Sequence, residues 1–497
     1  MGVIRKQSTY SSLIIYFGIL IGFLGTAILR PKILTPDEIG FLQVVLNMVS
    51  LFGAAAILGS HLLIVKMFPR FRTENQNNRG LFRLVMTIAF IGILICIPLL
   101  ILSEPLFFEN NSSERFLGIE YNFPLYLLLF LGIISKTFFY VFDNYLRMNH
   151  MSVQGTFSEN IILKALPIIA LLLLYLNWVN YTFVIYFNLI IYVIPLIIGW
   201  YYLKKIDAIR WVKPGPFTPD EKREMRGVAQ VGFVEIISFF IVLFIDVFML
   251  KRLMNDEAVG IYTTMFFFGA VVSVPLKALI RIAQPVISEA FALGDMDKIQ
   301  TIYQKSSNVL FLLGCLVFLL VWGNRYSVEH FLDPIYTQGI WVIFFIGLAH
   351  LVEVLSSVNY QIIAITPYFR FNLYMGVTTV VLLIATNYLF IHFFGLVGVA
   401  IGSLVSMILV NLARHIFLVH RYNLSPFSSS TLKILALGVF VFFISEWIPN
   451  LENLYFNAAM KTGVITILFV PAAYFLKCSE DFNMVADKYL RKFGLKS

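Results

Sequence analysis

Apolar residues along the chain are grouped into long runs that are separated by short polar segments. A helix that crosses a bilayer needs about 20 mostly apolar residues. We predict that each run of roughly this length forms one transmembrane helix, which gives an all-α polytopic membrane protein. The fourteen predicted spans are residues 10–30, 40–65, 81–103, 122–142, 160–177, 181–203, 228–250, 259–281, 305–323, 335–357, 370–391, 394–418, 431–448 and 454–477.

The positive charges favour one orientation of these spans. If the N-terminus is cytoplasmic, most of the 37 Lys and Arg residues fall in or beside cytoplasmic loops. Such loops are enriched in Lys and Arg in membrane proteins. We therefore expect a multi-pass protein of the inner (plasma) membrane with both termini in the cytoplasm. The net charge of +9 then reflects topology and does not indicate a nucleic-acid partner.

Composition supports the membrane class and argues against an enzyme. The chain has 497 residues, of which 59% are hydrophobic and 13% charged, whereas soluble domains have about 25% charged residues. The longest loops, near 204–227 and 104–121, are shorter than the roughly 40 residues that a stable domain usually needs. The three cysteines have neither metal-ligand nor disulfide spacing. We expect no cofactor and no metal.

A repeat divides the chain. The segment "KILTPDEIGFLQ" (32–43) has a counterpart about 219 residues later in "KRLMNDEAVGIYTT" (251–264), with one residue inserted. Six spans per repeat is an even number, so the two halves should be parallel repeats with a substrate site between them. We predict an N-terminal lobe at 1–213, a C-terminal lobe at 214–425, two further spans at 426–477 and a cytoplasmic amphipathic tail at 478–497. Thr218 and Glu221 predict a capping box at the start of the seventh span.

The plan of six, six and two spans resembles the multidrug/oligosaccharidyl-lipid/polysaccharide exporter superfamily. The start, "RKQSTYSSLIIYFGILIGFLGTAILRPKILTPDEIGFLQ", is similar to its polysaccharide-biosynthesis flippase branch, as is "PVISEAFALGDMDKIQTIYQKSS" (285–307). The resemblance implies two lobes around a cavity that opens alternately to either side. It also implies a lipid-linked sugar or a small cationic drug as the substrate.

Carboxyl groups inside the spans are candidates for binding a coupling ion. Glu235 and Asp246 lie eleven residues apart, which places them on one face of a helix and about 16 Å apart along its axis. A buried carboxylate is costly in a membrane and often functional. In the drug-exporting branch, acidic residues of spans seven and ten bind the coupling cation, which adds Glu353 by its position. The coupling ion would be H⁺ or Na⁺, although a salt bridge to a neighbouring helix would also explain such residues.

Cations inside the spans are candidates for binding an anionic substrate. Lys136, Lys277 and Arg281 belong to the cytoplasmic half under this topology, and Arg30 lies at the external end. Arg grips a pyrophosphate bidentately, and Lys adds a point charge. Both residue types also reach the membrane interface from such positions, so snorkelling is the alternative.

These residues favour a flippase that moves a polyprenyl-pyrophosphate-linked oligosaccharide across the membrane. Its partners would be this lipid-linked oligosaccharide, membrane lipids and other polysaccharide-assembly proteins. A small-molecule or multidrug exporter of the same superfamily is the first alternative. An intramembrane glycan polymerase is the second, but the short external loop near 104–121 offers little material for its chemistry.

Overall fold

The computed structural model describes residues 2–73, 77–107 and 123–492. Every regular element in these ranges is a helix. Fourteen helical segments within them are long and apolar enough to cross a membrane, and each overlaps one predicted span. The predicted all-α membrane fold is therefore confirmed. The closely spaced pairs are also separated as expected, because Leu176–Asn180 separates spans five and six and Gly395 separates spans eleven and twelve.

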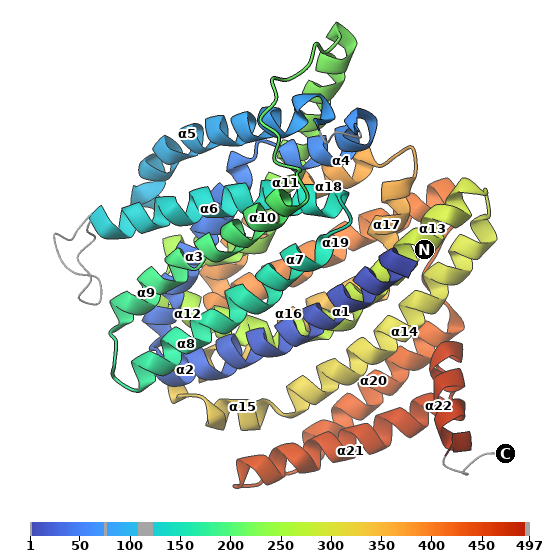
Figure 1. Ribbon diagram of the computed structural model, residues 1–497. Helices are drawn as coiled ribbons and strands as arrows, with labels where there is room; N and C mark the ends of the chain where they lie inside the picture. The colour runs from blue at the N-terminus through green and yellow to red at the C-terminus, as the bar shows by residue number, and fades with distance from the viewer. Residues whose placement is uncertain (1, 74–76, 108–122, 493–497) are drawn as a thin grey trace. The chain divides into compact units, whose positions relative to one another are not determined.

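The described chain forms two compact units, Met1–Gly260 and Ile261–Ser497. Figure 1 shows the helices of both units, with α6 beside α10 in the first. The helices of the first unit are α1 (Gly2–Phe23), η1 (Leu24–Leu29), α2 (Arg30–Ile33), α3 (Pro36–Ala56), α4 (Ser60–Phe71), η2 (Asn78–Gly80), α5 (Leu81–Phe107), α6 (Phe123–Met148), α7 (Ser152–Phe157), η3 (Ser158–Ile162), α8 (Leu163–Tyr175), α9 (Tyr181–Ile190), α10 (Val193–Lys205) and α11 (Pro219–Leu253).

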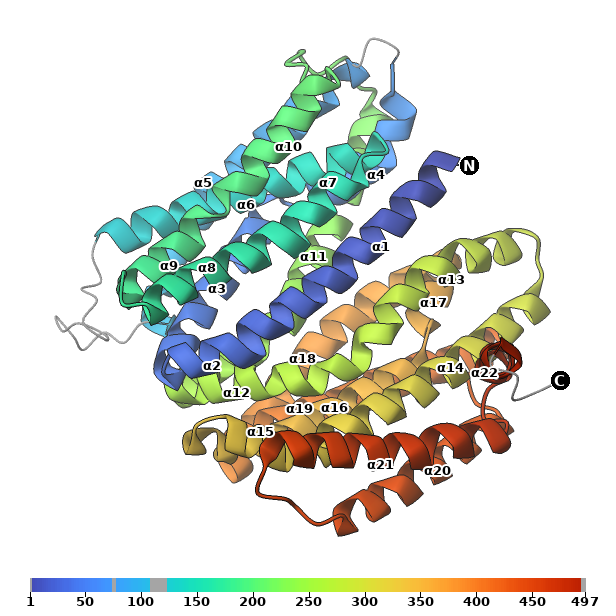
Figure 2. The same cartoon turned by 60° about the horizontal axis from the view of Figure 1, so that its bottom comes forward.

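Helix α12 (Asp256–Ala270) begins in the first unit and continues into the second. Figure 2 shows α20 and α21 side by side, with α22 at the end of α21. The other helices of the second unit are η4 (Val271–Ser273), α13 (Val274–Ala292), α14 (Met296–Gly323), α15 (Arg325–Phe331), η5 (Pro334–Gly339), α16 (Ile340–Ser356), α17 (Asn359–Ile365), α18 (Arg370–Phe394), α19 (Leu396–Tyr422), α20 (Ser429–Trp447), α21 (Leu454–Phe475) and α22 (Glu480–Lys492).

The seventh span, α11, packs against α3 and α4 in the first unit. The compact unit therefore extends beyond residue 213, where we placed the end of the N-terminal lobe. The division of the chain into lobes at residues 213 and 425 stays a prediction. The capping box at the start of α11 is confirmed, because Thr218 accepts a hydrogen bond from the Glu221 backbone N–H and Glu221 accepts one from that of Thr218.

The second span is broken, although we expected one helix over 40–65. Helix α3 ends at Ala56 and α4 begins at Ser60, with Leu58 and Gly59 at φ angles of 46° and 74°. Gly59 lies directly against α11, since a Cβ at this position would lie 2.0 Å from the Ala229 carbonyl oxygen. Apolar periodicity does not reveal this break, because the residues on both sides of it are hydrophobic.

The repeat appears in the first unit as a reciprocal contact between the starts of α3 and α12. Thr35 accepts a hydrogen bond from the Glu38 N–H, and Asn255 accepts one from the Ala258 N–H. Five residues after each cap stands a glycine, Gly40 or Gly260. When the two repeat segments are aligned on these caps, the two glycines coincide. The one-residue insertion that we expected is therefore not needed.

Each of these glycines touches the start of the other helix. A Cβ on Gly40 would lie 1.9 Å from the Asp256 carbonyl oxygen, and a Cβ on Gly260 would lie 1.9 Å from that of Pro36. Real Cβ atoms do not approach an oxygen so closely, so the two backbones meet where a side chain has no room. Lys251 pairs with Asp256 at 2.6 Å beside this contact.

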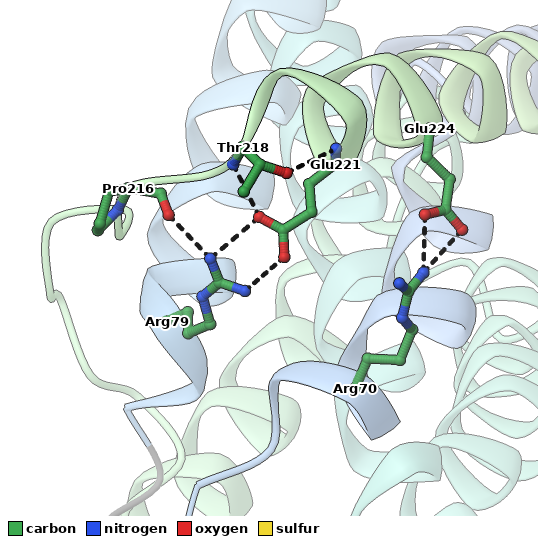
Figure 3. A network of polar contacts seen from close by, with 6 residues as sticks. All are labelled: Arg70, Arg79, Pro216, Thr218, Glu221 and Glu224. Carbon is green, nitrogen blue, oxygen red and sulfur yellow. Dashed lines mark hydrogen bonds and ion pairs between the residues drawn. The ribbon is translucent and has the colours of Figure 1, made fainter.

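A loop of the first unit is held by two arginines, as Figure 3 shows. Arg79 donates to both carboxylate oxygens of Glu221 at 2.7 and 3.1 Å and to the Pro216 carbonyl at 2.9 Å. Its guanidinium also lies 4.7 Å and 5.1 Å from the ring centres of Phe71 and Phe217. Arg70 pairs with Glu224 at 2.7 Å in a more exposed setting. The segment before α11 is therefore fixed to the loop between α4 and α5.

We predict that Gly40→Ala and Gly260→Ala each destabilise the protein. Overpacking of this kind typically costs about 1–3 kcal/mol, because the α3 and α12 backbones must move apart. Thermal unfolding of the purified variants measures the effect. The matched control is Gly463→Ala in α21, where an added Cβ would have no neighbouring atom within 4 Å. Equal melting temperatures for all three variants would contradict the close contact.

We also predict that Arg79→Ala exposes residues 206–217 to proteases more than Arg70→Ala does. Arg79 contacts the Pro216 carbonyl and the Phe217 ring of this segment and makes a bidentate ion pair with Glu221 at the adjoining start of α11. Arg70 makes only an exposed ion pair with Glu224 of α11, a type that contributes little. Limited proteolysis of the two variants, with the cleavage sites identified by mass spectrometry, provides the comparison. Equal cleavage rates would show that Arg79 does not hold the segment.

Candidate functional site

Lys136 is a buried cation in the membrane-spanning part of α6. Its side chain is 9% exposed, and its Nζ lies 3.4 Å from the Glu159 carboxylate, whose side chain is 33% exposed. Glu159 belongs to η3, a π-helical segment, and such segments often occur at functional sites. The predicted candidate Lys136 is therefore part of an ion pair whose carboxylate is the more exposed member.

Three aromatic rings surround the Lys136 ammonium group. Its Nζ lies 4.8 Å from the ring centre of Tyr140, 5.5 Å from that of Tyr192 and 5.6 Å from that of Phe139. Aromatic faces attract cations, most strongly where water is excluded. The lysine stem packs on Gly53 of α3, where a Cβ would lie 3.1 Å from the stem carbons. Glu159 and these rings together offset the cost of placing the charge there.

A second ion pair lies on the same helix. Arg147 and Asp143 are 2.6 Å apart, and the Asp143 side chain is 5% exposed. Its Oδ1 lies against Gly155 of α7, so close that a Cβ there would be 1.6 Å away. We call these residues the Lys136 cluster: Lys136, Phe139, Tyr140, Asp143, Arg147, Glu159 and Tyr192. Its two cations are matched by two carboxylates.

The second unit has its own polar cluster around Glu353. His350 Nδ1 lies 2.8 Å from the Glu353 carboxylate. The charges of Lys277 on α13 and Arg414 on α19 also act on this carboxylate. Lys277 is exposed, and Arg414 lies 5.4 Å from the ring centre of Tyr360. We call these five residues the Glu353 cluster.

The Glu353 cluster retains hydrogen-bonding capacity. The buried Nε of Arg414 has no hydrogen-bond partner among the described residues. The cluster has two permanent cations and one carboxylate, so an anionic group is the complementary ligand. In the sequence, Arg414 lies near the cytoplasmic end of the predicted span 394–418 and was counted only as a topology signal, so it was missed as a site residue. Its place is set by the long helix α19, which continues to Tyr422.

The spacing of three, four and four residues between His350, Glu353, Ser357 and Gln361 predicts one polar stripe along the tenth span. The structure interrupts this stripe. Helix α16 ends at Ser356, and Ser357 has a φ of 49°. Ser357 Oγ donates to Ser306 Oγ at 2.7 Å. Ser357 therefore joins α14 and does not extend the surface formed by His350 and Glu353.

Two predicted carboxylates have different environments. Asp246 is buried, whereas Glu235 is exposed. The positive charge of Lys66 acts on the Glu235 carboxylate. Lys251, which the sequence suggested as a partner for Asp246, pairs with Asp256. Their shared helical face therefore does not give the two carboxylates the same surroundings.

Of the remaining predicted cations, Arg30 is buried and donates to Gln43 at 3.3 Å, and Gln43 donates to Asn47 at 2.9 Å. Arg30 is thus held inside the first unit by α3. Arg281 belongs to α13, but its side chain lies outside the described part of the structure. Within the described residues, no group of three or more His, Cys, Asp or Glu could hold a metal ion.

The sequence matches the family model described as "Polysaccharide biosynthesis protein" over residues 4–291. This match covers more than half of the chain. The chain belongs to the polysaccharide biosynthesis protein family. The family assignment confirms the predicted branch of the exporter superfamily.

Solved structures show the same fold. A lipid II flippase, MurJ, in an inward closed conformation aligns with a TM-score of 0.71 at 13% identity, covering 94% of this chain and 98% of that one. An inward-facing multidrug resistance MATE family transporter aligns with a TM-score of 0.61 at 14% identity, covering 82% and 93%. A superfamily transporter from Pyrococcus furiosus aligns at 0.55 and 13%, covering 83% and 95%. No curated protein sequence matched.

Proposed function

We propose that this protein is a plasma-membrane flippase for a polyprenyl-pyrophosphate-linked oligosaccharide. It would move this lipid from the cytoplasmic to the outer face by alternating access, with both termini in the cytoplasm. The observation that carries the proposal is membership of the polysaccharide biosynthesis family, together with a fold shared with a lipid II flippase over nearly the full length of both chains.

The Glu353 cluster supports an anionic substrate. Lys277 and Arg414 outnumber the carboxylate of the Glu353 cluster, and Arg414 has an unused donor. A pyrophosphate accepts several hydrogen bonds from Arg and Lys. In this proposal, Lys277, Arg281 and Lys136 bind the headgroup and Arg30 assists its release. Other polysaccharide-assembly proteins would supply and receive the lipid.

The proposed reaction is translocation, without a covalent step or a cofactor. Alternating access around a site at the repeat interface needs only a change in which side is open. Glu353 would couple this change to H⁺ or Na⁺, because its carboxylate lies 2.8 Å from His350 Nδ1 and the charges of Lys277 and Arg414 act on it. Asp246 and Glu235 are the further candidates for coupling.

A small-molecule exporter is the second candidate, favoured by the fold shared with multidrug transporters. Such an exporter of cations would need an acidic pocket, and the Glu353 cluster has more cations than carboxylates. An intramembrane polymerase has less support, because the predicted external loop near 104–121 is short and offers little material for its chemistry.

We predict that a polyprenyl pyrophosphate raises the melting temperature of the purified protein and that a hydrophobic cation does not. A ligand at 100 times its Kd adds about 2.7 kcal/mol to the stability. Replacing Lys136, Lys277 and Arg281 together with Gln should remove most of this shift, since the pyrophosphate loses its counter-charges. Thermal-shift titration measures it.

The control for this titration replaces Lys204, Lys205 and Lys222 with Gln, which removes the same charge outside the proposed site. This control should keep the wild-type shift. Stabilisation by the hydrophobic cation alone would instead favour the exporter. An unchanged shift in the first triple variant would exclude its three cations from binding the headgroup.

We further predict that Glu353→Gln abolishes the dependence of transport on an ion gradient, because the variant can no longer exchange a bound H⁺ or Na⁺. Reconstituted vesicles with an imposed H⁺ or Na⁺ gradient provide the measurement, with Glu235→Gln and Asp246→Asn compared alongside. Glu224→Gln, which changes an exposed carboxylate near the start of α11 in Figure 3, is the control. Gradient-stimulated transport that survives in Glu353→Gln would exclude this residue from coupling.

A further inference from the structure

Helix α22, the last described helix, does not continue the span that precedes it. Helix α21 ends at Phe475, and Lys477 has a φ of 51°, which turns the chain. Ser479 Oγ then accepts a hydrogen bond from the Phe482 backbone N–H at 3.4 Å and caps the new helix. Figures 1 and 2 both show α22 lying across the end of α21. A helix that crosses the end of a membrane span lies where the bilayer meets water.

One side of α22 is attached to the second unit. Glu480 pairs with Lys305 of α14 at 3.0 Å, and the Tyr474 hydroxyl of α21 donates to Asp487. Phe482 packs against the apolar core that α14, α20 and α21 share. These contacts come from both ends of the helix, so they fix which side of α22 faces the unit.

The opposite side of α22 is exposed and combines apolar and basic residues. Met484, Val485 and Tyr489 are 60%, 56% and 58% exposed, and Lys488 and Arg491 are exposed beside them. Helices of this kind lie in the membrane interface, where the apolar side chains enter the acyl boundary and Lys and Arg meet the phosphate groups. A lipid surface is therefore the partner that fits this side.

The charge of the exposed side selects the kind of lipid. The carboxylates of Glu480 and Asp481 act on Lys305, and that of Asp487 is bound by Tyr474. The exposed side therefore carries positive charge, which complements anionic phospholipids, and these are enriched in the cytoplasmic leaflet. A second copy of this chain fits less well, because two such faces docked on each other would bring like charges together.

We propose that α22 is an interfacial helix that binds anionic phospholipids of the cytoplasmic leaflet. Met484, Val485 and Tyr489 enter the bilayer surface, and Lys488 and Arg491 contact the phosphate groups. This interaction is separate from the transport site and does not depend on which substrate is moved. Because α22 is attached to α14 and α21, the lipid also holds the ends of these two helices at the membrane surface.

The test measures the surroundings of position 485 in a bilayer. A spin label on Val485→Cys reports its accessibility to oxygen, which concentrates in the bilayer, and to a water-soluble nickel chelate. Each lipid nanodisc holds one protein molecule, so no second copy is present. Asp220→Cys at the exposed start of α11 is the reference for water, and Phe440→Cys, 61% exposed within the span α20, is the reference for lipid. The wild type, whose three cysteines are buried, gives the background labelling.

In nanodiscs of phosphatidylcholine with phosphatidylglycerol, the oxygen-to-nickel ratio at position 485 should approach that at position 440. In phosphatidylcholine alone it should fall towards that at position 220. Replacing Lys488 and Arg491 with Gln should cause the same fall in the mixed lipid, because each basic residue strengthens binding to an anionic surface about fivefold. Replacing Lys204 and Lys205 with Gln is the control, since it removes the same charge from the first unit and should change nothing at position 485.

A ratio at position 485 equal to that at position 220 in both lipids would overturn the proposal, because the exposed side would then lie in water. A high ratio that responds neither to phosphatidylglycerol nor to the loss of Lys488 and Arg491 would overturn the role of anionic lipid. If Val485→Cys does not fold, Tyr489→Cys repeats the measurement on the same side of the helix.

Discussion

The reciprocal contact of Gly40 and Gly260 fixes how closely the starts of α3 and α12 approach. Each glycine lies against a carbonyl oxygen of the other helix, so the two backbones meet without side chains between them. Helix α3 carries Gln43, which accepts a hydrogen bond from Arg30, and Gly53, which lies against the Lys136 stem. The Lys136 cluster thus packs on a helix whose starting point is set by these small residues.

Some buried charges within the spans are balanced by an opposite charge nearby, whereas the buried Arg30 is held by the neutral Gln43. An unpaired charge in hydrocarbon is costly, and the Lys136 cluster meets this cost with two alternating ion pairs and aromatic rings. The Glu353 cluster differs, because its cations exceed its carboxylates. The first cluster has as many carboxylates as cations, whereas in the second the cations outnumber the single carboxylate.

The number and positions of the spans could be predicted because hydrophobic length is a local property of the sequence, as is the capping box at Thr218. The candidate site was only partly predictable. Glu159 lies 23 residues from Lys136, and a helical pattern relates only neighbours three or four positions apart. The same limit explains why Arg414 was missed as a site residue. It also explains why Ser357 was assigned to a continuous polar stripe, and why Glu235 and Asp246 were expected to have similar surroundings.

The contacts of Arg70 and Arg79 also bear on the order in which the chain is made. Their carboxylate partners, Glu224 and Glu221, follow 154 and 142 residues later. Domains generally fold from the N-terminus during synthesis. These two ion pairs therefore cannot form until α5 to α10 and the start of α11 have been synthesised. The first unit can complete this part of its structure once the start of α11 has been made, before residues 261–497 are synthesised.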